Sequence, residues 1–310
     1  MDSGGGEVSE DTWGGEGRAA GGEATEAAGS SQRRHLEVEA RRATPGSRPP
    51  CRAPRREPYG LHAARVMVSR DVRLSASSFV RLYLPLPAAG DKRLPVVVYF
   101  HGGGSYRRCL NDLAAACPPV AVSVDYRLTL EHPLPAAYED PTAALAWVLS
   151  VADPWLAAHG PLSRVFLASD SAGGNICHHL AMCHGLTSQH LPCRLKGIVM
   201  IHPWFWGKEP IGGEAADGAD DPRMNPTAAG APGLENLACE KVMVCVAEGD
   251  TLRWRGRAYA EAVVRARGGE AAAVELLESE GVGHVFYLFE PGHEKADELL
   301  RRIAAFISAK

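Results

Sequence analysis

Hydrophobic and polar side chains follow a new rhythm from about residue 62 onward. Two segments, 64–72 and 79–86, alternate apolar and polar residues, which is the period of strands with one buried face. The next segment, 94–100, is a continuous apolar run rich in β-branched residues, as expected of a strand buried on both faces. The sheet is therefore predicted to begin with antiparallel strands and to continue with fully buried ones.

Strand and helix patterns then alternate to the end of the chain. Further strands are predicted at 120–126, 164–169, 195–201, 241–248 and 273–278, and helices at 106–117, 141–152, 172–184, 255–267 and 294–309. Such alternation predicts an α/β fold, a mostly parallel doubly wound sheet with helices on both faces and right-handed crossovers. No internal repeat is evident, and the pattern fits one domain over residues 58–310.

Residues 1–57 differ in composition from the rest of the chain. The first part is rich in Gly, Ala and Glu with almost no large apolar side chains, and the second part turns basic. Such a segment buries too little apolar surface to offset the entropy that ordering costs. We predict a disordered low-complexity tail, whose basic cluster is solvated rather than docked on an acidic partner.

Composition and charge limit the range of partners. The 310 residues carry a net charge of −4, with 45% hydrophobic and 23% charged residues, as is ordinary for a globular protein. This charge gives no reason to expect nucleic acid as a partner. The lack of a long apolar run predicts no membrane span. We expect a small-molecule partner, and the oligomeric state does not follow from the sequence.

The N-terminus and the cysteines bear on location. The start of the chain lacks the basic and then apolar pattern of a secretory signal, and its acidic residues argue against a transit peptide. The eight cysteines are irregularly spaced, and several fall inside predicted helices or strands, unlike a disulfide framework. We predict reduced thiols in a cytoplasmic protein.

One predicted helix combines residue types that bind metals. His179 and Cys183 are four residues apart and share a face of the helix 172–184, with His178 and His184 nearby. A structural zinc site usually draws four ligands from two such clusters. No second cluster occurs at a matching spacing, so no metal is predicted.

Four polar motifs follow predicted strands. The motif HGGG (101–104) follows the first buried strand, Ser171 lies in the segment LASDSAGGN, and Asp250 and His284 follow the last two strands. In a doubly wound sheet such positions meet at the carboxyl edge. Serine, aspartate and histidine also appear in the chain order of α/β-hydrolase triads. Each motif alone has an ordinary explanation, such as a flexible turn or a helix N-cap; their joint order and placement favour catalysis.

The three side chains have distinct predicted roles. His284 would take the proton from Ser171 Oγ and return it to the leaving group. Asp250 would hold the histidine tautomer and stabilise the imidazolium. Backbone N–H groups after two strands would form the oxyanion hole, aided by the positive end of a helix dipole. These donors are Gly102, Gly103 and Ala172.

Five segments together resemble one plant family. They are VVVYFHGGG, VAVSVDYRLTLEHPLPAAYED, DSAGGN, GDTLRWRGRAY and GVGHVFYL, and the similarity runs from about residue 62 to the C-terminus. This family is the plant carboxylesterases of the hormone-sensitive-lipase-like group, related to the gibberellin receptors and the 2-hydroxyisoflavanone dehydratases. The resemblance implies an α/β-hydrolase fold, no cofactor, and hydrolysis of short-chain carboxylic esters. By position it assigns the same triad and the same oxyanion glycines.

The chain departs from the family pattern in four places. Ser169 replaces the first glycine of the nucleophile motif Gly-x-Ser-x-Gly, and the segment after HGGG is short. The segment 202–226 is also short, and the tail replaces an N-terminal segment that helps to cover the pocket in the family. These differences predict a reduced lid and a wetter acyl pocket, in which electrostatic interactions are weaker.

The sequence leaves four functional interpretations open. The leading one is a cytosolic serine carboxylesterase, because the receptor branch lacks the catalytic histidine and His284 is present here. The shortened lid also fits a non-catalytic, hormone-like small-molecule binding protein, and the dehydratase branch keeps the triad. A fourth interpretation is an inactive protein of marginal stability. The acyl and alcohol preference does not follow from the sequence.

Overall fold

The computed structural model describes residues 66–86, 93–103, 110, 113, 116–129, 131–186, 195–209, 211, 221–270, 273–290 and 292–309. The chain divides into two units, Met1–Pro54 and Arg55–Lys310, and every described residue belongs to the second unit. The predicted tail and its boundary at residue 57 lie outside the described residues.

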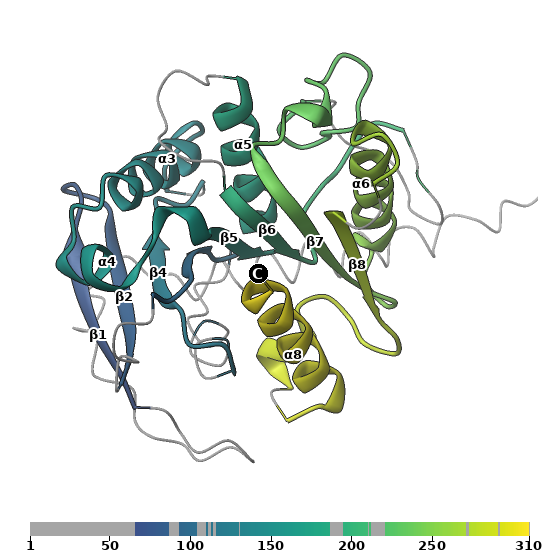
Figure 1. Ribbon diagram of the computed structural model, residues 1–310. Coiled ribbons are helices and arrows are strands. Elements are labelled where there is room, and N and C mark those ends of the chain that lie inside the picture. Colours follow the sequence, from purple (N-terminus) through teal and green to yellow (C-terminus); the bar gives the residue numbers. More distant parts are fainter. Residues whose placement is uncertain are drawn as a thin grey trace, which may run out of the picture. The chain divides into compact units, whose positions relative to one another are not determined.

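The described strands form one mixed sheet in the spatial order β1-β2-β4-β3-β5-β6-β7-β8 (Figure 1). Their bounds are Val66–Arg73 (β1), Phe79–Leu86 (β2), Val96–Phe100 (β3), Val120–Asp125 (β4), Val165–Asp170 (β5), Leu195–Ile201 (β6), Cys239–Ala247 (β7) and Val274–Ser279 (β8). The pairs β1–β2 and β2–β4 are antiparallel, and the other pairs are parallel. Because β3 and β5 bury every residue, the predicted change from alternating to fully buried strands is confirmed.

The described helices lie on both faces of this sheet. Their bounds are Ala136–Leu149 (α3), Pro154–His159 (α4), Ala172–Leu186 (α5), Arg253–Ala266 (α6), Phe286–Phe289 (α7) and Glu294–Ser308 (α8), with 3-10 turns at Leu162–Arg164 and Leu234–Asn236. In Figure 1, α3, α5 and α6 lie on one side of the sheet and α8 lies on the other. None of the helices in the described part of the chain is long and apolar enough to cross a membrane.

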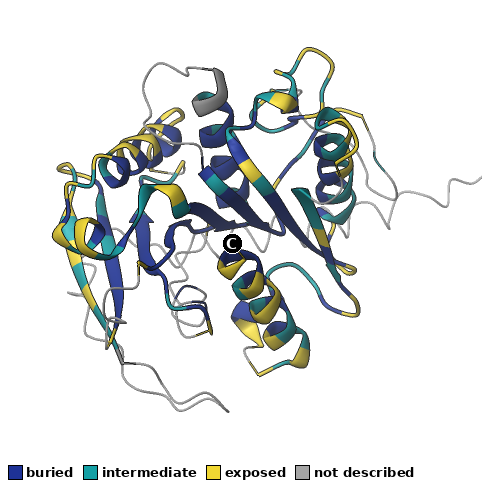
Figure 2. Cartoon of the chain, in the orientation of Figure 1, coloured by how far each residue is buried: buried dark blue, intermediate teal, exposed yellow. Residues whose placement is uncertain are grey.

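Two apolar layers, one on each face of the sheet, form the core. Val96 and Val98 of β3 belong to one layer, and Val97 and Tyr99 belong to the other, because successive strand residues point to opposite faces. The first layer contains buried side chains of α3, α5 and α6, and the second contains those of α8. Figure 2 shows the central strands almost entirely buried. The predicted doubly wound arrangement is therefore confirmed.

Helix α3 begins earlier than the sequence pattern predicts. The periodicity places its start at Pro141, whereas the helix begins at Ala136. Ala137 and Tyr138 in the additional turn are buried, so apolar packing stabilises residues that the local pattern does not mark as helical. The helix predicted at 106–117 falls mostly outside the described residues.

The parallel strands bring the predicted motifs to one edge of the sheet. Phe100 of β3 pairs with Ser169 of β5, and Ala247 of β7 pairs with Ser279 of β8. These strands therefore end at similar heights, and each of the four predicted motifs follows one of these ends. Side chains that are far apart along the chain can meet there.

Candidate active site

Ser171 lies on a tight turn between β5 and α5. Its φ angle is +48°, a left-handed conformation that residues other than glycine seldom adopt. Its N–H donates to Ile201 O at 2.9 Å. A Cβ on Gly173 would lie 2.0 Å from Phe100 O, so only glycine lets α5 approach β3 this closely. This strained turn and close helix present the serine at the end of its strand, as in a nucleophile elbow.

The serine that replaces the first elbow glycine is accommodated in the core. Ser169 is fully buried, and its hydroxyl donates to Val199 O at 3.2 Å. Burial raises the pKa of the neighbouring Cys177 to about 12, and a hydrogen bond with Ser169 acts against this rise. Because these neighbours satisfy the hydroxyl, the departure from the glycine pattern leaves the turn at Ser171 intact.

His284 joins Ser171 to Asp250. Its Nε2 lies 2.9 Å from Ser171 Oγ, and its Nδ1 lies 2.6 Å from Asp250 Oδ2. Asp250 is buried, and its second oxygen, Oδ1, accepts a hydrogen bond from Leu252 N–H at 2.9 Å. The side chain of His284 is 34% exposed, which leaves the imidazole accessible to a small molecule. The structure thus brings the three predicted side chains into one hydrogen-bonded row.

The loops that carry the carboxylate and the imidazole are tied together. Gly249 N–H donates to Val282 O at 2.9 Å, and Gly281 N–H donates to Glu248 Oε2 at 2.8 Å. Gly281 has a φ angle of +71°, which glycine adopts at little cost. These bonds fix the loop after β7 against the loop after β8, and so they set the separation of the two side chains.

The three predicted oxyanion donors differ in their surroundings. The N–H of Gly102 donates to Asp170 Oδ1 at 2.8 Å and is engaged in that bond. At Gly103, a Cβ would meet no atom of the described residues within 4 Å. Ala172 is the first residue of α5, where a backbone N–H has no intrahelical acceptor. The geometry therefore favours Gly103 and Ala172 over Gly102 as donors.

Asp170 belongs to the site although sequence reasoning does not single it out. It directly precedes Ser171 and is buried. Its carboxylate accepts hydrogen bonds from Gly102 N–H and, at 3.1 Å, from Tyr99 OH. Burial raises the pKa of this carboxyl group, and the nearby His101 and the two donors act against this rise. The only feature of the sequence that could have indicated its role is its position next to Ser171.

His202 follows β6 at the same edge of the sheet. It is 1% exposed, and its ring centroid lies 5.7 Å from that of His284. Its Nδ1 accepts a 2.8 Å hydrogen bond from the N–H of Val285. In the sequence it is only the first residue of the short segment 202–226. No local pattern indicates that it contacts the loop of His284.

The metal-binding residue types on α5 face different neighbours. His178 is buried with its Nδ1 3.0 Å from Tyr259 OH, and burial lowers its pKa to about 3. Cys183 Sγ lies 3.4 Å from His179 Nε2. The side chain of His184 is outside the described residues. These contacts do not bring the predicted residue types together around one point.

Within the described residues, one other group has ligand-type atoms close together. Atoms of His202, Asp250 and His284 lie within 4.8 Å of one another. Asp250 and His284 are hydrogen-bonded to each other, and His202 Nδ1 already accepts from a backbone N–H. The donor set therefore fits a hydrogen-bonded row better than a metal site.

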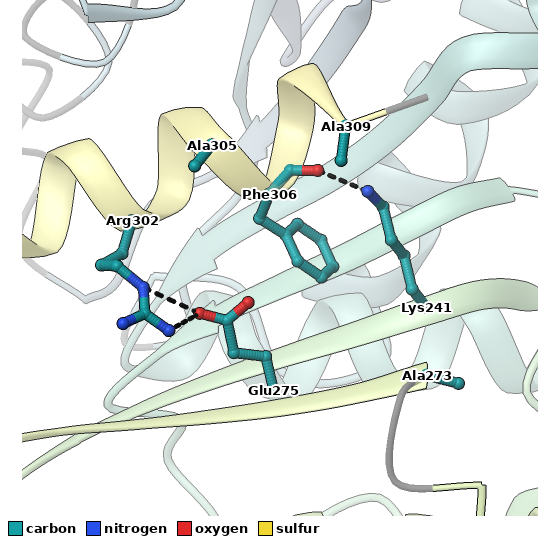
Figure 3. Close-up of a pocket in the computed structure, with 7 residues that line it drawn as sticks. All are labelled: Lys241, Ala273, Glu275, Arg302, Ala305, Phe306 and Ala309. Atoms are coloured by element: carbon teal, nitrogen blue, oxygen red, sulfur yellow. Dashed lines mark hydrogen bonds and ion pairs between the residues drawn. The ribbon is translucent and has the colours of Figure 1, made fainter.

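A hollow on the molecule lies away from this row. It has a volume of about 290 Å³, and Figure 3 shows Lys241, Glu275 and Arg302 among the side chains around it. Lys241 and Glu275 stand near the amino ends of β7 and β8, at the edge opposite to Asp250. Arg302 pairs with Glu275, and Lys241 Nζ donates to Phe306 O at 2.5 Å. The charged side chains of the hollow are therefore paired, and the hollow is not part of the candidate site, because it lies at the opposite edge of the sheet.

A hydrogen-bonded serine, aspartate and histidine in this chain order, with the serine on a strand-to-helix turn at the carboxyl edge of a mostly parallel sheet, is typical of the α/β-hydrolases. The model of the alpha/beta hydrolase fold family matches residues 97–217 and 211–288. The chain belongs to this family.

Similar proteins come from plants. Probable carboxylesterase 2 from Arabidopsis thaliana is 38% identical over 81% of this chain and 88% of its own length. The chloroplastic tuliposide A-converting enzyme 2 from Tulipa gesneriana is 40% identical over 81% of this chain and 73% of its own length. A 2-hydroxyisoflavanone dehydratase from Glycyrrhiza echinata is 36% identical over 80% of this chain and 85% of its own length. The resemblance to plant carboxylesterases and dehydratases is thereby confirmed.

A solved structure agrees with the fold. The hyperthermophilic esterase from the archaeon Pyrobaculum calidifontis matches with a TM-score of 0.62 and 28% identity, over 77% of this chain and 85% of that chain. The names of the Arabidopsis relative and of this structural neighbour are consistent with a carboxylic ester hydrolase.

Proposed function

We propose that this protein is a serine carboxylesterase that hydrolyses short-chain carboxylic esters. One observation carries the proposal: a single imidazole lies 2.9 Å from Ser171 Oγ and 2.6 Å from Asp250 Oδ2. A hydroxyl group is a weak nucleophile until an adjacent base takes its proton, and this row supplies both the base and the group that orients it.

The reaction proceeds in two halves. Ser171 Oγ bonds to the ester carbonyl carbon while its proton passes to His284 Nε2. The tetrahedral intermediate then loses the alkoxy group, which receives that proton and departs as the alcohol. In the second half a water molecule gives a proton to His284 and attacks the acyl group. The acid leaves, and the proton returns to Ser171. Throughout, Asp250 stabilises the imidazolium.

The oxyanion receives hydrogen bonds from the N–H groups of Gly103 and Ala172. A Cβ on Gly103 would meet no described atom within 4 Å, and Ala172 starts a helix whose positive dipole end points at the developing charge. Gly102 has a different task in this scheme. Its bond to Asp170 holds the start of the HGGG loop against the serine turn.

The named relatives support an ester as the substrate. The Arabidopsis relative is called a probable carboxylesterase, and the archaeal structural neighbour is called an esterase. The reduced lid stays a prediction, because residues 104–109 and 212–220 lie outside the described part of the chain. The resemblance to the plant carboxylesterases is the reason for proposing short-chain esters.

Hydrolysis of 4-nitrophenyl acetate and butyrate tests the proposal. The wild-type chain should release nitrophenol, and Ser171→Ala should lose at least about 1000-fold in kcat. Ser150→Ala is a matched control, because Ser150 is exposed at the end of α3 and its hydroxyl donates to the carbonyl oxygen of Trp147 in the same helix. Equal rates in the wild type and Ser171→Ala would remove the proposal.

Labelling by a fluorophosphonate, followed by mass mapping of the modified peptide, gives a second test. This probe reacts with a serine only when a base activates it. Ser171 should carry the label in the wild type and in Ser150→Ala. A non-catalytic binding protein would instead bind a small molecule saturably without labelling or turnover.

A dehydratase is the second candidate function. It is favoured by the 36% identity to a 2-hydroxyisoflavanone dehydratase. Elimination would convert a 2-hydroxyisoflavanone to a product that is lighter by one water, whereas ester hydrolysis adds one water across the cleaved bond. Mass spectrometry of the products with both substrate types separates the two functions.

Cytoplasmic location and the absence of nucleic acid or membrane partners stay predictions. The tuliposide A-converting relative is named as chloroplastic, so the compartment differs at least in one similar protein. Expression of the chain with a fluorescent fusion in leaf cells would decide between the cytoplasm and the chloroplast.

A further inference from the structure

His202 is a buried histidine at the candidate site to which the reaction above gives no role. It comes directly after β6, its N–H donates to Cys245 O of β7 at 2.8 Å, and its φ angle is +48°. Its backbone is thus fixed between two central strands in a conformation that is costly for a residue with a side chain. A strained, rigid position of this kind suits a side chain that must point in one direction.

The ring of His202 holds the chain immediately after His284. Its Nδ1 accepts a 2.8 Å hydrogen bond from the N–H of Val285. Val285 itself has a φ angle of +45°, so the loop turns sharply at this residue and places His284 before the turn. Without an acceptor at this point, a partly buried N–H next to the imidazole would lose its protein partner.

This hydrogen bond also fixes the tautomer of His202. Since Nδ1 accepts, the ring proton lies on Nε2. Among the described residues this buried Nε2 has no hydrogen-bond partner. Burial lowers the pKa of the His202 imidazole to about 3, the charge of Asp250 acts against this, and His284 adds to it. The ring therefore stays neutral and does not compete as a cation with His284 for Asp250.

We infer that His202 is a positioning residue, which fixes His284 between Ser171 and Asp250 by accepting the hydrogen bond from Val285 N–H. This inference rests on the proposed function. The property that matters is the acceptor at Nδ1, rather than the bulk of the ring or its second nitrogen. The ring also contacts the aromatic side chains of Phe286 and Tyr287, at centroid distances of 5.9 and 6.2 Å, which a purely structural role would explain equally well.

Two amide variants separate these roles. In His202→Asn the amide oxygen falls near the place of Nδ1 and can accept from Val285 N–H, whereas in His202→Gln the amide reaches toward the place of Nε2. Both are polar and uncharged, so they are matched in the cost of burial. We expect His202→Gln to lose about 10- to 100-fold in kcat with KM within about threefold, because a base displaced by a fraction of an ångström is poorly aligned. His202→Asn should retain most of the wild-type kcat.

Hydrogen exchange at the Val285 amide gives a readout that does not need turnover. Measured on the full chain by mass spectrometry of the peptide around Val285, exchange should accelerate in His202→Gln and remain slow in His202→Asn. The variant His202→Phe, which keeps a ring of similar size without an acceptor, should behave like His202→Gln. If either amide variant does not fold, as judged by its melting temperature, His202→Phe is compared with the wild type instead.

Equal kcat and equal exchange in the acceptor and non-acceptor variants would overturn the inference. This failure is distinguishable from failure of the proposed function. If only the inference about His202 fails, the wild type hydrolyses nitrophenyl esters and Ser171→Ala does not. If the proposed function fails, the wild type itself is inactive, and hydrogen exchange at the Val285 amide still tests whether His202 holds the loop.

Discussion

The backbone N–H of Gly102 donates a 2.8 Å hydrogen bond to the carboxylate of Asp170. This bond joins the loop after β3 to the residue directly before the nucleophile, so the oxyanion loop and the serine turn are set relative to each other. A Cβ on Gly102 would lie 3.0 Å from Ser171 Cβ, which shows how closely the loop approaches the serine. The N–H of Gly102, which the sequence assigns to the oxyanion hole, instead holds the oxyanion loop in place through Asp170.

Asp170→Ala should lower both stability and activity. It removes the acceptor of two buried donors, Gly102 N–H and Tyr99 OH, at a cost of about 1–3 kcal/mol for each unsatisfied group. The loosened loop should reduce kcat by about 10- to 100-fold. Urea unfolding and ester hydrolysis measure the two effects. Tyr99→Phe, which removes only one donor, is the control; an Asp170→Ala enzyme with wild-type kcat would contradict the positioning argument.

Asp250→Asn should leave the fold intact and impair catalysis. The amide keeps the size of the carboxylate but does not stabilise the imidazolium, and it favours the wrong tautomer of His284. We expect kcat to fall by about 10,000-fold, with the melting temperature little changed. Kinetics with a nitrophenyl ester and fluorophosphonate labelling measure the effect. A loss of less than tenfold would show that Asp250 is not the orienting group.

Gly173→Ala should destabilise the protein strongly. A Cβ at this position would lie 2.0 Å from Phe100 O, and a backbone oxygen in a central strand cannot move aside. Overpacking of this kind costs at least about 2 kcal/mol. Gly292→Ala is the matched control, because Gly292 is exposed and a Cβ there would meet no described atom within 4 Å. The free energies of unfolding should differ between the two variants, and similar values would argue against the tight approach of α5 to β3.

The stability should fall on mild acidification. Burial lowers the pKa of both His178 and His202 from 6.5 to about 3, so both are neutral in the folded protein and become protonated on unfolding. Because the unfolded chain binds more protons below pH 6.5, the stability is fully present above that pH and declines toward pH 3. Each histidine contributes up to about 1.4 kcal/mol per pH unit.

Urea unfolding between pH 7.5 and 4.5 measures this slope. His178→Phe removes one titrating group while keeping a ring between Phe205 and Tyr259, so its slope should be smaller than that of the wild type. A variant with an unchanged slope would show that His178 does not contribute in this way.

The sequence predicted the large features of the fold because they depend on local patterns. Apolar runs identified β3 to β7, and helical periodicity identified α5, α6 and α8. It misplaced the start of α3, since Ala137 and Tyr138 become helical through core packing rather than through their own pattern. The triad residues were also identifiable, because each stands in a short motif after a strand.

The sequence by itself determined the class of fold, the order of its elements and the three residue types that form the row. Periodicity and motif spacing are properties of neighbours along the chain, and these features need nothing more. Only the tertiary structure decided that Gly102 donates to Asp170 and that His202 holds the loop of His284 through Val285. Those contacts join residues 68 and 83 positions apart, and they depend on which strands pair and at what height. No local pattern carries that information.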